Sequence, residues 1–475
     1  MDQAIFALVF VPPLAAAMVS ILPGGRAGLA ASVAGGALSL AASALLFLSG
    51  AQGRYGYFYA DGLTGVLLVT ISSIFLTSVA YSAFYLKRVE GSLLHFRWYY
   101  ALMDLFAVTM LLAVMVNDLG LIWIFVEATT VTSALLVALE RQRTSVEAAW
   151  RYTLIVSSGL AASLLSVVLV YLSQGTLQMS ELLVDPAARP VVLLLAVGFA
   201  LVGYGTKAGI APMHAWLPDA HSEAPSPVSA MFSGILLPTS LYAFYRTFAL
   251  LRGTQYFAAA QDLAIGFGVL TALVAALIMG HQRNYKRMLA YSSMENMGLI
   301  LVGFALGGIG AVGALIQVVS HAFAKSSAFY ESGNILTVYR TKDMSSVKGM
   351  EGRLRYTTYL FLLSCMSVTG APPFGVFLGE FMILSRVAQT GNVPLLTVLA
   401  AIYVYAFVGL NRQAIGMAFG EAREAAPPVR EEVLSVLLPA VNLALSLLVG
   451  LLLAPGLMGA AGLASLPAAT GGFLP

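Results

Sequence analysis

Apolar runs of about 20 residues recur from one end of this chain to the other, as in 4–22, 149–172 and 434–455. A run of that length crosses the roughly 30 Å hydrocarbon core of a bilayer as a single helix. Charged residues make up only 10% of the chain, against roughly 25% in an average soluble domain. No alternation of apolar and polar residues recurs over about ten residues, as membrane strands would require. The sequence therefore predicts an all-α integral membrane protein.

The apolar runs and the breaks between them predict fourteen spans joined by short loops. The longest polar connection, 339–355, has room for only a turn or two of structure, so no soluble domain is expected. The predicted spans are 4–22, 28–48, 59–86, 98–116, 119–139, 149–172, 191–211, 225–250, 258–280, 288–306, 309–338, 357–389, 394–419 and 434–455.

Lysine and arginine are unevenly distributed among the predicted loops. Eighteen of them fall in loops that follow odd-numbered spans. Only five fall in loops that follow even-numbered spans, namely Arg54, Arg189, Arg246, Arg252 and Arg386. Because positive residues favour cytoplasmic loops, we expect the odd-numbered loops in the cytoplasm and both termini outside.

Composition also argues against several classes of function. The net charge of +3 is dispersed, without the basic stripe that nucleic acid binding requires. Cys365 is the only cysteine, so the chain offers no thiolate set for an iron–sulfur cluster or a structural zinc. Any redox centre is therefore expected in a partner subunit. The N-terminus lacks the positive start of a signal peptide, so the first apolar run is predicted to be a span.

Four of the ionisable residues inside the predicted spans stand out. Lys207 and Lys325 are the lysines that remain once the loop residues are removed, and Glu127 and Glu380 lie in apolar sequence. A charge costs several kcal/mol in hydrocarbon, so each such residue is by default a functional hypothesis. Burial disfavours the charged form of a lysine or a carboxylate, and a nearby opposite charge favours it, so a pair whose members move forms a proton switch. The alternative for Glu127 is that it neutralises a cation on an adjacent helix.

Lys207 stands five residues before Pro212, where the apolar sequence is interrupted. Pro212 has no N–H to donate, so we expect a carbonyl of the preceding turn to need water, a side chain or an ion. A lysine beside such a hydrated break is suited to accept and release a proton. The alternative is a lysine that extends to the membrane interface.

Two histidines follow this break. His214 and His221 are seven residues apart, which is no recognised zinc spacing, so no metal site is expected. We expect His214 to bridge the break, and Asp219 with Glu223 to cap the helix that begins in 225–227.

A second group of polar residues lies in the eleventh span. His321 and Lys325 are four residues apart and share one helix face, so they suit successive stations of a hydrogen-bonded relay. A histidine satisfied within the core is the alternative. Arg151 and Glu295 lie near span ends, where each is either a relay element or an anchor.

The twelfth span repeats a feature of the seventh. Pro372-Pro373 follows Gly-Ala as Pro212 follows Ile-Ala, five spans earlier. Glu380 lies eight residues further on, roughly 12 Å along a helix, as an exit carboxylate or an interfacial acid. Because five is odd, two such five-helix units have opposite topology, the inverted-repeat plan of transporters. The expected organisation is a three-span segment in 1–97, repeats in 98–250 and 258–419, and a C-terminal span and tail in 434–475.

Several of these stretches resemble one family. The region 207–227 with its His-Ala-Trp-Leu-Pro-Asp-Ala-His element, the sequence Lys-Arg-Met-Leu-Ala-Tyr-Ser-Ser in 286–293, the stretch 321–325 and the stretch 369–384 are similar to antiporter-like proton-translocating subunits. Such subunits occur in respiratory complex I, Mrp-type sodium/proton antiporters and energy-converting membrane hydrogenases. Glu295 after Tyr-Ser-Ser and the Ala-Pro-Ser-Pro-Val-Ser tract look most like the F-type subunit of hydrogenase-4 and formate hydrogenlyase.

The resemblance implies roles for the four buried charges. Glu127 takes the place of the family's fifth-span glutamate, Lys207 of its seventh-span lysine, Lys325 of its central eleventh-span lysine and Glu380 of its twelfth-span ionisable residue. One departure is that Pro238 stands where family members often carry an eighth-span lysine. Onward transfer from Lys207 is then left to waters or to nearby polar side chains, namely Ser233, Thr239, Ser240 or His321.

The resulting hypothesis is a proton-translocating membrane subunit of a multi-subunit oxidoreductase, with no redox site of its own. By resemblance its partners are other antiporter-like and quinone-site-type membrane subunits and a peripheral redox arm that holds iron–sulfur or metal centres. The expected location is a bacterial or archaeal cytoplasmic membrane. Two alternatives are an Mrp-type monovalent cation/proton antiporter subunit and a structural subunit that does not pump.

Overall fold

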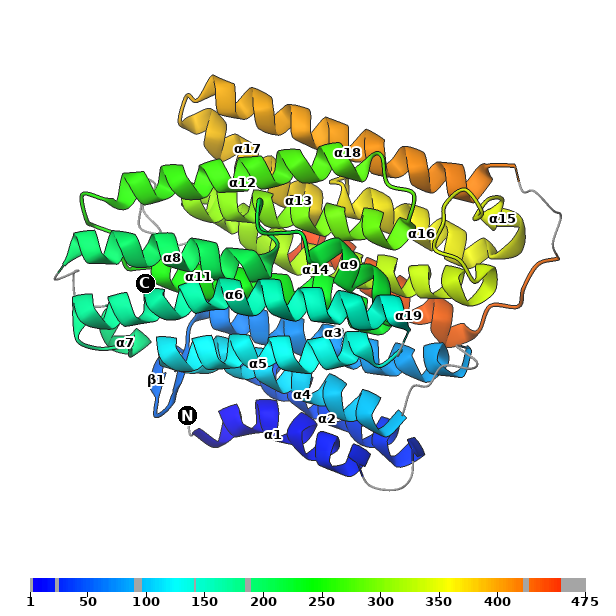
Figure 1. The fold of residues 1–475 in the computed structure, drawn as a ribbon, viewed down its shortest axis with the longest axis horizontal. Coiled ribbons are helices and arrows are strands. Elements are labelled where there is room, and N and C mark those ends of the chain that lie inside the picture. The colour runs from blue at the N-terminus through cyan, green and yellow to red at the C-terminus, as the bar shows by residue number, and fades with distance from the viewer. Residues whose placement is uncertain are drawn as a thin grey trace.

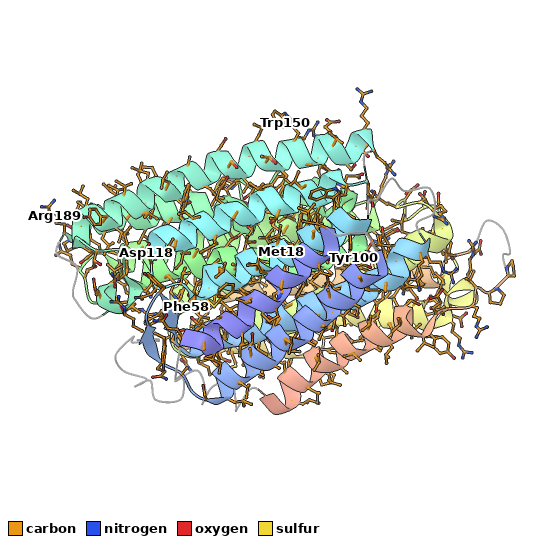
Figure 2. The ribbon with its side chains drawn as sticks, turned by 90° about the horizontal axis from the view of Figure 1, so that it is seen from below. Met18, Phe58, Tyr100, Asp118, Trp150 and Arg189 are labelled. Carbon is orange, nitrogen blue, oxygen red and sulfur yellow. The ribbon has the colours of Figure 1, made fainter. Side chains whose placement is uncertain are left out.

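The computed structural model describes residues 3–21, 25–88, 96–140, 142–183, 189–421 and 427–453. Its long helices lie side by side with roughly parallel axes, so they form a single helical bundle (Figure 1). α1 (Gln3–Ile21) and α2 (Gly25–Leu48) lie at one edge of the bundle. Large apolar side chains such as Met18 and Trp150 are exposed on its outside (Figure 2), as expected of a surface that faces lipid.

Thirteen helices of the described residues are long and apolar enough to cross a membrane. Besides α1 and α2 they are α3 (Gly62–Arg88), α4 (Phe96–Met115), α5 (Leu119–Ala138), α6 (Arg143–Gln174), α8 (Pro190–Ala208), the composite of α10 (Ser226–Met231), η1 (Phe232–Leu236) and α11 (Leu237–Ala249), α12 (Phe257–Met279), α13 (Tyr285–Leu306), α14 (Ile309–Tyr339), α18 (Val393–Phe419), and α19 (Val433–Leu448) with η2 (Val449–Leu453). Short helices are α7 (Met179–Leu182), α9 (Leu217–Glu223) and α15 (Met350–Arg353). The predicted all-α membrane protein is confirmed.

The predicted span 357–389 is divided between two helices. α16 (Arg355–Val368) has 14 residues and α17 (Gly375–Gln389) has 15, so neither crosses a bilayer alone. The link between them contains Gly370, whose φ of 71° few residues with a side chain adopt. The two short helices account for the difference between fourteen predicted spans and thirteen long helices.

The seventh span ends differently from the prediction. α8 stops at Ala208 because Gly209 adopts a left-handed conformation with φ of 80°, which closes a helix without a side-chain clash. Pro212 therefore lies beyond the helix instead of breaking it. The Thr206 carbonyl of the last turn accepts a hydrogen bond from the Trp216 indole at 2.8 Å, so a side chain supplies the partner that we expected the break to need.

The helix that contains Pro238 is locally widened. Pro238 is the second residue of α11 and has no N–H. The five residues before α11 form the π-helical segment η1. The backbone N–H of Leu237 bonds to the carbonyl of Phe232, five residues back. Such a π segment inserts one residue into the helix and commonly marks functional sites.

A short β-hairpin precedes α3 and was not predicted. β1 (Gly53–Tyr55) pairs antiparallel with β2 (Phe58–Ala60). The predicted start of the third span at 59 is therefore wrong, since the helix begins at Gly62.

Phe58, Asp118 and Arg189 gather toward one end of the bundle in Figure 2, the end that the sequence predicts to be outside.

Arg246 is not a loop residue, contrary to the prediction. It lies in α11 with 2% of its surface exposed. Its guanidinium donates to both oxygens of Asp61 at 2.5 and 2.8 Å. The rings of Tyr242 and Tyr59 lie 4.7 and 5.6 Å from the guanidinium carbon. This buried ion pair joins α11 to the start of α3 and removes Arg246 from the even-numbered loops.

Candidate functional site

The first lysine site consists of Glu127, Thr130, Tyr152 and Lys207. Lys207 is fully buried in the last turn of α8. Its Nζ donates to the Thr130 hydroxyl at 2.5 Å and to the Tyr152 hydroxyl at 3.3 Å. α5 carries Thr130 and α6 carries Tyr152, so three helices meet at this amino group. Because α8 ends one residue later, at Ala208, the lysine lies at the end of a helix, where partial negative charge favours an ammonium.

Glu127 lies one turn before Thr130 on α5, within electrostatic reach of Lys207. Its Oε1 accepts a hydrogen bond from Ser157 at 2.6 Å. Its Oε2 is buried and has no hydrogen-bond partner in the described part of the chain. The carboxylate is therefore close to the ammonium without being bonded to it, and one of its oxygens is open to a new partner.

His221 lies on α9 and is fully buried. Its Nδ1 bonds to the carbonyl of Leu217 at 2.8 Å, which makes that nitrogen the N–H donor. Its buried Nε2 has no partner among the described residues, and Lys325 lies within electrostatic reach of the ring. The sequence analysis considered His221 only as a metal ligand. The sequence feature that could have indicated a proton-carrying role is the position of His221, close after the interruption at Pro212.

The second lysine site consists of Ser292, Glu295, His321, Lys325 and Glu380. Lys325 is fully buried near the middle of α14 and donates to the Leu289 carbonyl at 2.7 Å and to the Ser292 hydroxyl. His321, one turn earlier, lies against the backbone of Ser233. Neither nitrogen of its ring has a hydrogen-bond partner in the ranges described above. The predicted shared face of His321 and Lys325 is thus directed into the protein.

The carboxylates of this site come from two helices. Glu295 of α13 accepts a hydrogen bond from the Asn296 side chain at 2.8 Å. Glu380 of α17 lies within electrostatic reach of Glu295, and both lie within reach of the buried Tyr403 hydroxyl. A Cβ on Gly370 would collide with the Glu380 carboxylate. The interruption between α16 and α17 therefore makes room for Glu380.

Arg151 and His214 lie apart from these two sites. The Arg151 side chain is 57% exposed and pairs with Glu147 at 2.5 Å and with Asp219 at 3.7 Å. His214 faces the ring of Tyr291 at 6.4 Å, and burial lowers its pKa. These contacts favour an anchoring role for Arg151.

The expected capping role of Asp219 and Glu223 is wrong. Pro225 precedes α10 without any side-chain cap. Asp219 pairs with Arg287 at 2.7 Å, and Glu223 pairs with Lys342 at 3.0 Å. Both acids tie α9 to neighbouring basic residues.

A cavity of about 610 Å³ opens at the end of the bundle that holds most of the positive loop residues. Glu140, Arg340 and Lys342 are among the residues that line it. Burial raises the pKa of Glu140, against the opposing effect of Lys286 and Lys342. Lys286 is buried and donates to the carbonyl of Ala224 at 2.7 Å. Water in this cavity would come close to the buried polar interior.

Sequence reasoning missed two buried carboxylates besides Asp61. Asp104 of α4 accepts a hydrogen bond from Ser32 at 2.7 Å, and Glu331 of α14 accepts from Ser327 at 3.1 Å. Both are fully buried. Their positions inside the apolar runs 98–116 and 309–338 were the signal. Among the described residues, no three His, Cys, Asp or Glu side chains come close enough to share a metal ion.

A membrane-spanning helical bundle with lysines and carboxylates buried along its interior has the architecture of an antiporter-like membrane protein. The protein-family model described as "NADH:quinone oxidoreductase/Mrp antiporter, TM" matches residues 116–405. This match covers more than half of the chain, and the chain therefore belongs to that family. The resemblance drawn from the sequence is confirmed.

Individual relatives agree with this assignment. The "Hydrogenase-4 component F homolog" of Methylacidiphilum infernorum is 32% identical over 402 residues, which cover 81% of this chain and 83% of that protein. "NADH-quinone oxidoreductase subunit N" of Desulforudis audaxviator is 31% identical over 333 residues, 68% of this chain and 65% of that protein.

Two solved structures share the fold. A chain of the membrane-bound sulfane sulfur reductase, an archaeal respiratory membrane complex, matches with a TM-score of 0.89 and 22% identity, over 98% of this chain and 97% of that one. A chain of the Mrp complex from Dietzia sp. matches with a TM-score of 0.84 and 21% identity, over 97% of both chains. Both belong to multi-subunit membrane complexes.

Proposed function

We propose that this chain is the proton-translocating subunit of a multi-subunit redox complex, in which electron transfer in partner subunits drives ion movement across the membrane. The observation that carries the proposal is the first lysine site. There a buried amino group is held by two hydroxyls while a carboxylate close by keeps one oxygen unpaired. The similarity to hydrogenase-4 component F and to a complex I subunit supports a redox complex.

The first lysine site is suited to act as a switch. Burial disfavours an ammonium, and an approaching carboxylate favours it. If Glu127 turns its free oxygen toward Lys207, the lysine holds its proton more tightly. If Glu127 turns away, the proton is more readily released to a neighbouring group. A partner subunit that moves Glu127 would therefore control the charge of Lys207.

His221 is the candidate for onward transfer, because Pro238 offers no side chain that carries a proton. Its free Nε2 accepts a proton, and its Nδ1–H then remains on the Leu217 carbonyl. Lys325 lies within electrostatic reach of the ring and is held by Ser292 and Leu289. Waters would complete the connection. Glu295 and Glu380 would then lead the proton toward the opposite face.

The remaining parts of the proposal concern orientation and partners. The two broken regions, 208–217 and 368–375, suit two inverted five-helix repeats in 98–250 and 258–419, with ion sites near the breaks. Both termini would lie outside a prokaryotic cytoplasmic membrane. Iron–sulfur or metal centres and the quinone site would belong to partner subunits, and Arg151 and His214 would support the first site from its rim.

Replacement of Lys207 by Met in the assembled complex tests this function. With the complex reconstituted in vesicles, proton translocation per electron transferred should fall by about a hundredfold, the lower end of what a positioned proton-transfer group contributes. Lys348→Met is the matched control, since Lys348 lies outside the spans and donates to the Gly416 carbonyl. Unchanged translocation by a fully assembled Lys207→Met complex would overturn the proposal.

The fold shared with the Dietzia Mrp complex favours a second candidate, a monovalent cation/proton antiporter without redox coupling. Purification of the native assembly distinguishes the two. Iron–sulfur spectra from copurifying subunits would support the redox complex, and transport that requires Na⁺ or K⁺ without an electron donor would support the antiporter. A purely structural subunit would instead show altered assembly and unchanged transport per complex after Glu127→Gln.

A further inference from the structure

Glu331 is a buried carboxylate that the proposed path does not use. It lies on α14 six residues after Lys325, about 9 Å along the helix axis, and eight residues before the helix end at Tyr339, about 12 Å away. None of its surface is exposed. It therefore stands between the central lysine and the end of the bundle that the sequence predicts to be cytoplasmic.

One oxygen of Glu331 is fixed and the other is free. Oε1 accepts from Ser327 at 3.1 Å and from Ser364 of α16 at 3.3 Å. Oε2 is buried and has no partner within the described ranges. A buried carboxyl oxygen without a partner is costly, and water is the usual partner for such a group. Ionisable groups inside membrane helices typically mark ion paths.

The groups that face Glu331 connect it to Lys325. Cys365 of α16 lies within electrostatic reach of both Glu331 and Lys325. Tyr81 of α3 also lies within reach of Glu331, and its hydroxyl donates to the Tyr330 carbonyl at 2.6 Å. In the described part of the chain, the side chains that hydrogen-bond to Glu331 are the neutral Ser327 and Ser364. Lys325 is then the nearest base on its own helix.

Polar side chains continue from Glu331 toward the helix end. Asn334, one turn later, donates to Thr357 of α16 at 3.1 Å and to the Ser435 carbonyl at 2.8 Å. That carbonyl lacks its helical partner because Pro439, four residues on, has no N–H. Thr357 in turn donates to Glu431, which is only half-buried, at 2.6 Å. We call this line of Ser327, Glu331, Asn334, Thr357 and Ser364 the α14 seam.

We propose that the α14 seam is a second proton route that joins Lys325 directly to the predicted cytoplasmic side, with Glu331 as its proton carrier. In each transfer, protonated Glu331 gives its proton through intervening water to the neutral amine of Lys325, which leaves a carboxylate and an ammonium. The carboxylate then takes up a proton that water along the seam relays from the predicted cytoplasmic side. The inference rests on the proposed function, because it assumes that Lys325 carries protons.

Glu331→Gln in the assembled, reconstituted complex is the main test. Gln keeps an oxygen that accepts hydrogen bonds from Ser327 and Ser364 but cannot release or take up a proton. If Glu331 had only a structural role, translocation would therefore be unchanged. Proton translocation per electron should fall by about a hundredfold with normal assembly. Asp104→Asn is the matched control, a buried carboxyl with one serine partner and one unpaired oxygen on the side of α1 and α2, and should leave translocation unchanged.

Lys325→Met separates the two hypotheses. If Lys325→Met translocates normally, the proposed function fails. If Lys325→Met is impaired while Glu331→Gln translocates like the wild type, only the second route is overturned. Should Glu331→Gln not assemble, Ser364→Ala keeps the carboxylate and removes one donor, and about a threefold loss is expected; no loss would overturn the route.

Cys365 supplies an independent readout of water in the seam. Its thiol signal in infrared spectra of the complex is isolated by subtracting the Cys365→Ala spectrum. In deuterated buffer the S–H should exchange within minutes if water enters the seam. A thiol that stays unexchanged over many hours would overturn the route, whatever the fate of the variants.

Discussion

The two lysine sites place the lysine and the carboxylate at opposite positions relative to a helix end. At the first, the lysine stands in the last turn of α8, where hydroxyls of two other helices hold it and the carboxylate lies on α5. At the second, Lys325 stands within the continuous helix α14, and α17, which begins after the link from α16, carries the carboxylate Glu380. The interruption after α8 thus lies beside a base, and the interruption between α16 and α17 lies beside an acid.

The holding groups differ as well, since Lys207 depends on two hydroxyls whereas Lys325 also has the Leu289 carbonyl. We therefore expect the first site to be more easily disturbed by loss of a single hydroxyl.

The largest expected effect concerns the packing that supports the first half. Arg246→Met would leave Asp61 buried without its partner, which costs about 3–5 kcal/mol. The midpoint of thermal unfolding of the purified complex should fall strongly. Replacement of the exposed Arg412 by Met is the control. Addition of Asp61→Asn should restore part of the loss, because neither charge then remains, and a failure to restore any would contradict the ion-pair explanation.

The two breaks should respond differently to a methyl group. Gly209→Ala and Gly370→Ala each place a side chain at positive φ, which costs about 1–3 kcal/mol. At Gly209 the methyl meets the end of the flexible Leu217 side chain, whereas at Gly370 it meets the Glu380 carboxylate. We expect both variants to unfold at lower temperature but only Gly370→Ala to lose much proton translocation per assembled complex. Equal losses in translocation would remove the distinction between the breaks.

Loss of one hydroxyl should separate the lysine sites. Thr130→Val removes the 2.5 Å acceptor of Lys207 and should slow proton translocation by about tenfold, the lower end of what a hydrogen bond to a charged group contributes. Ser292→Ala leaves Lys325 its carbonyl acceptor, so a two- to threefold effect, roughly, is expected. The measurement is the initial rate of acidification in vesicles. A larger effect for Ser292→Ala would reverse the comparison.

The smallest effect concerns pH and the rim of the first site. Burial raises the pKa of Glu223, but the charge of Lys342 and hydrogen bonds from Lys342, Thr144 and Ser222 lower it by more. The pKa of Glu223 is therefore lowered overall. A carboxylate with a lowered pKa stabilises the fold above its unfolded value and loses that contribution as pH falls through the folded value. Glu223→Gln should therefore flatten the acid side of the thermal stability profile by less than about 1 kcal/mol. An unchanged acid limb would contradict this.

Much of the fold could be predicted because hydrocarbon imposes a simple rule on sequence. Each span must be apolar and about 20 residues long, so most span positions agree with the observed helices. The errors fall where local features act instead. The hairpin before α3 occupies only three residues a strand, and the end of α8 depends on the left-handed Gly209 and not on the more conspicuous Pro212.

The candidate site was only partly predictable. Lys207, Lys325, Glu127 and Glu380 stand out because each is charged within an apolar run. Arg246 was misplaced because it lies in the last turn of its helix, where an arginine is easily taken for a loop residue. Its partner Asp61 is 185 residues away in the chain, so nothing in the sequence indicated the ion pair. His221 was undervalued because sequence spacing says nothing of which lysine its ring faces.

The sequence by itself determined that this chain is a membrane bundle, that its polar groups lie inside, and which family it resembles. The reason is that residues inside a bilayer must be apolar, so the few charged residues within the spans stand out in the sequence itself. Only the tertiary structure decided which groups meet. The unpaired oxygen of Glu127, the hydroxyls that hold Lys207 and the position of Glu331 beside Ser364 all depend on contacts between helices distant in the chain, and those contacts follow from packing in three dimensions.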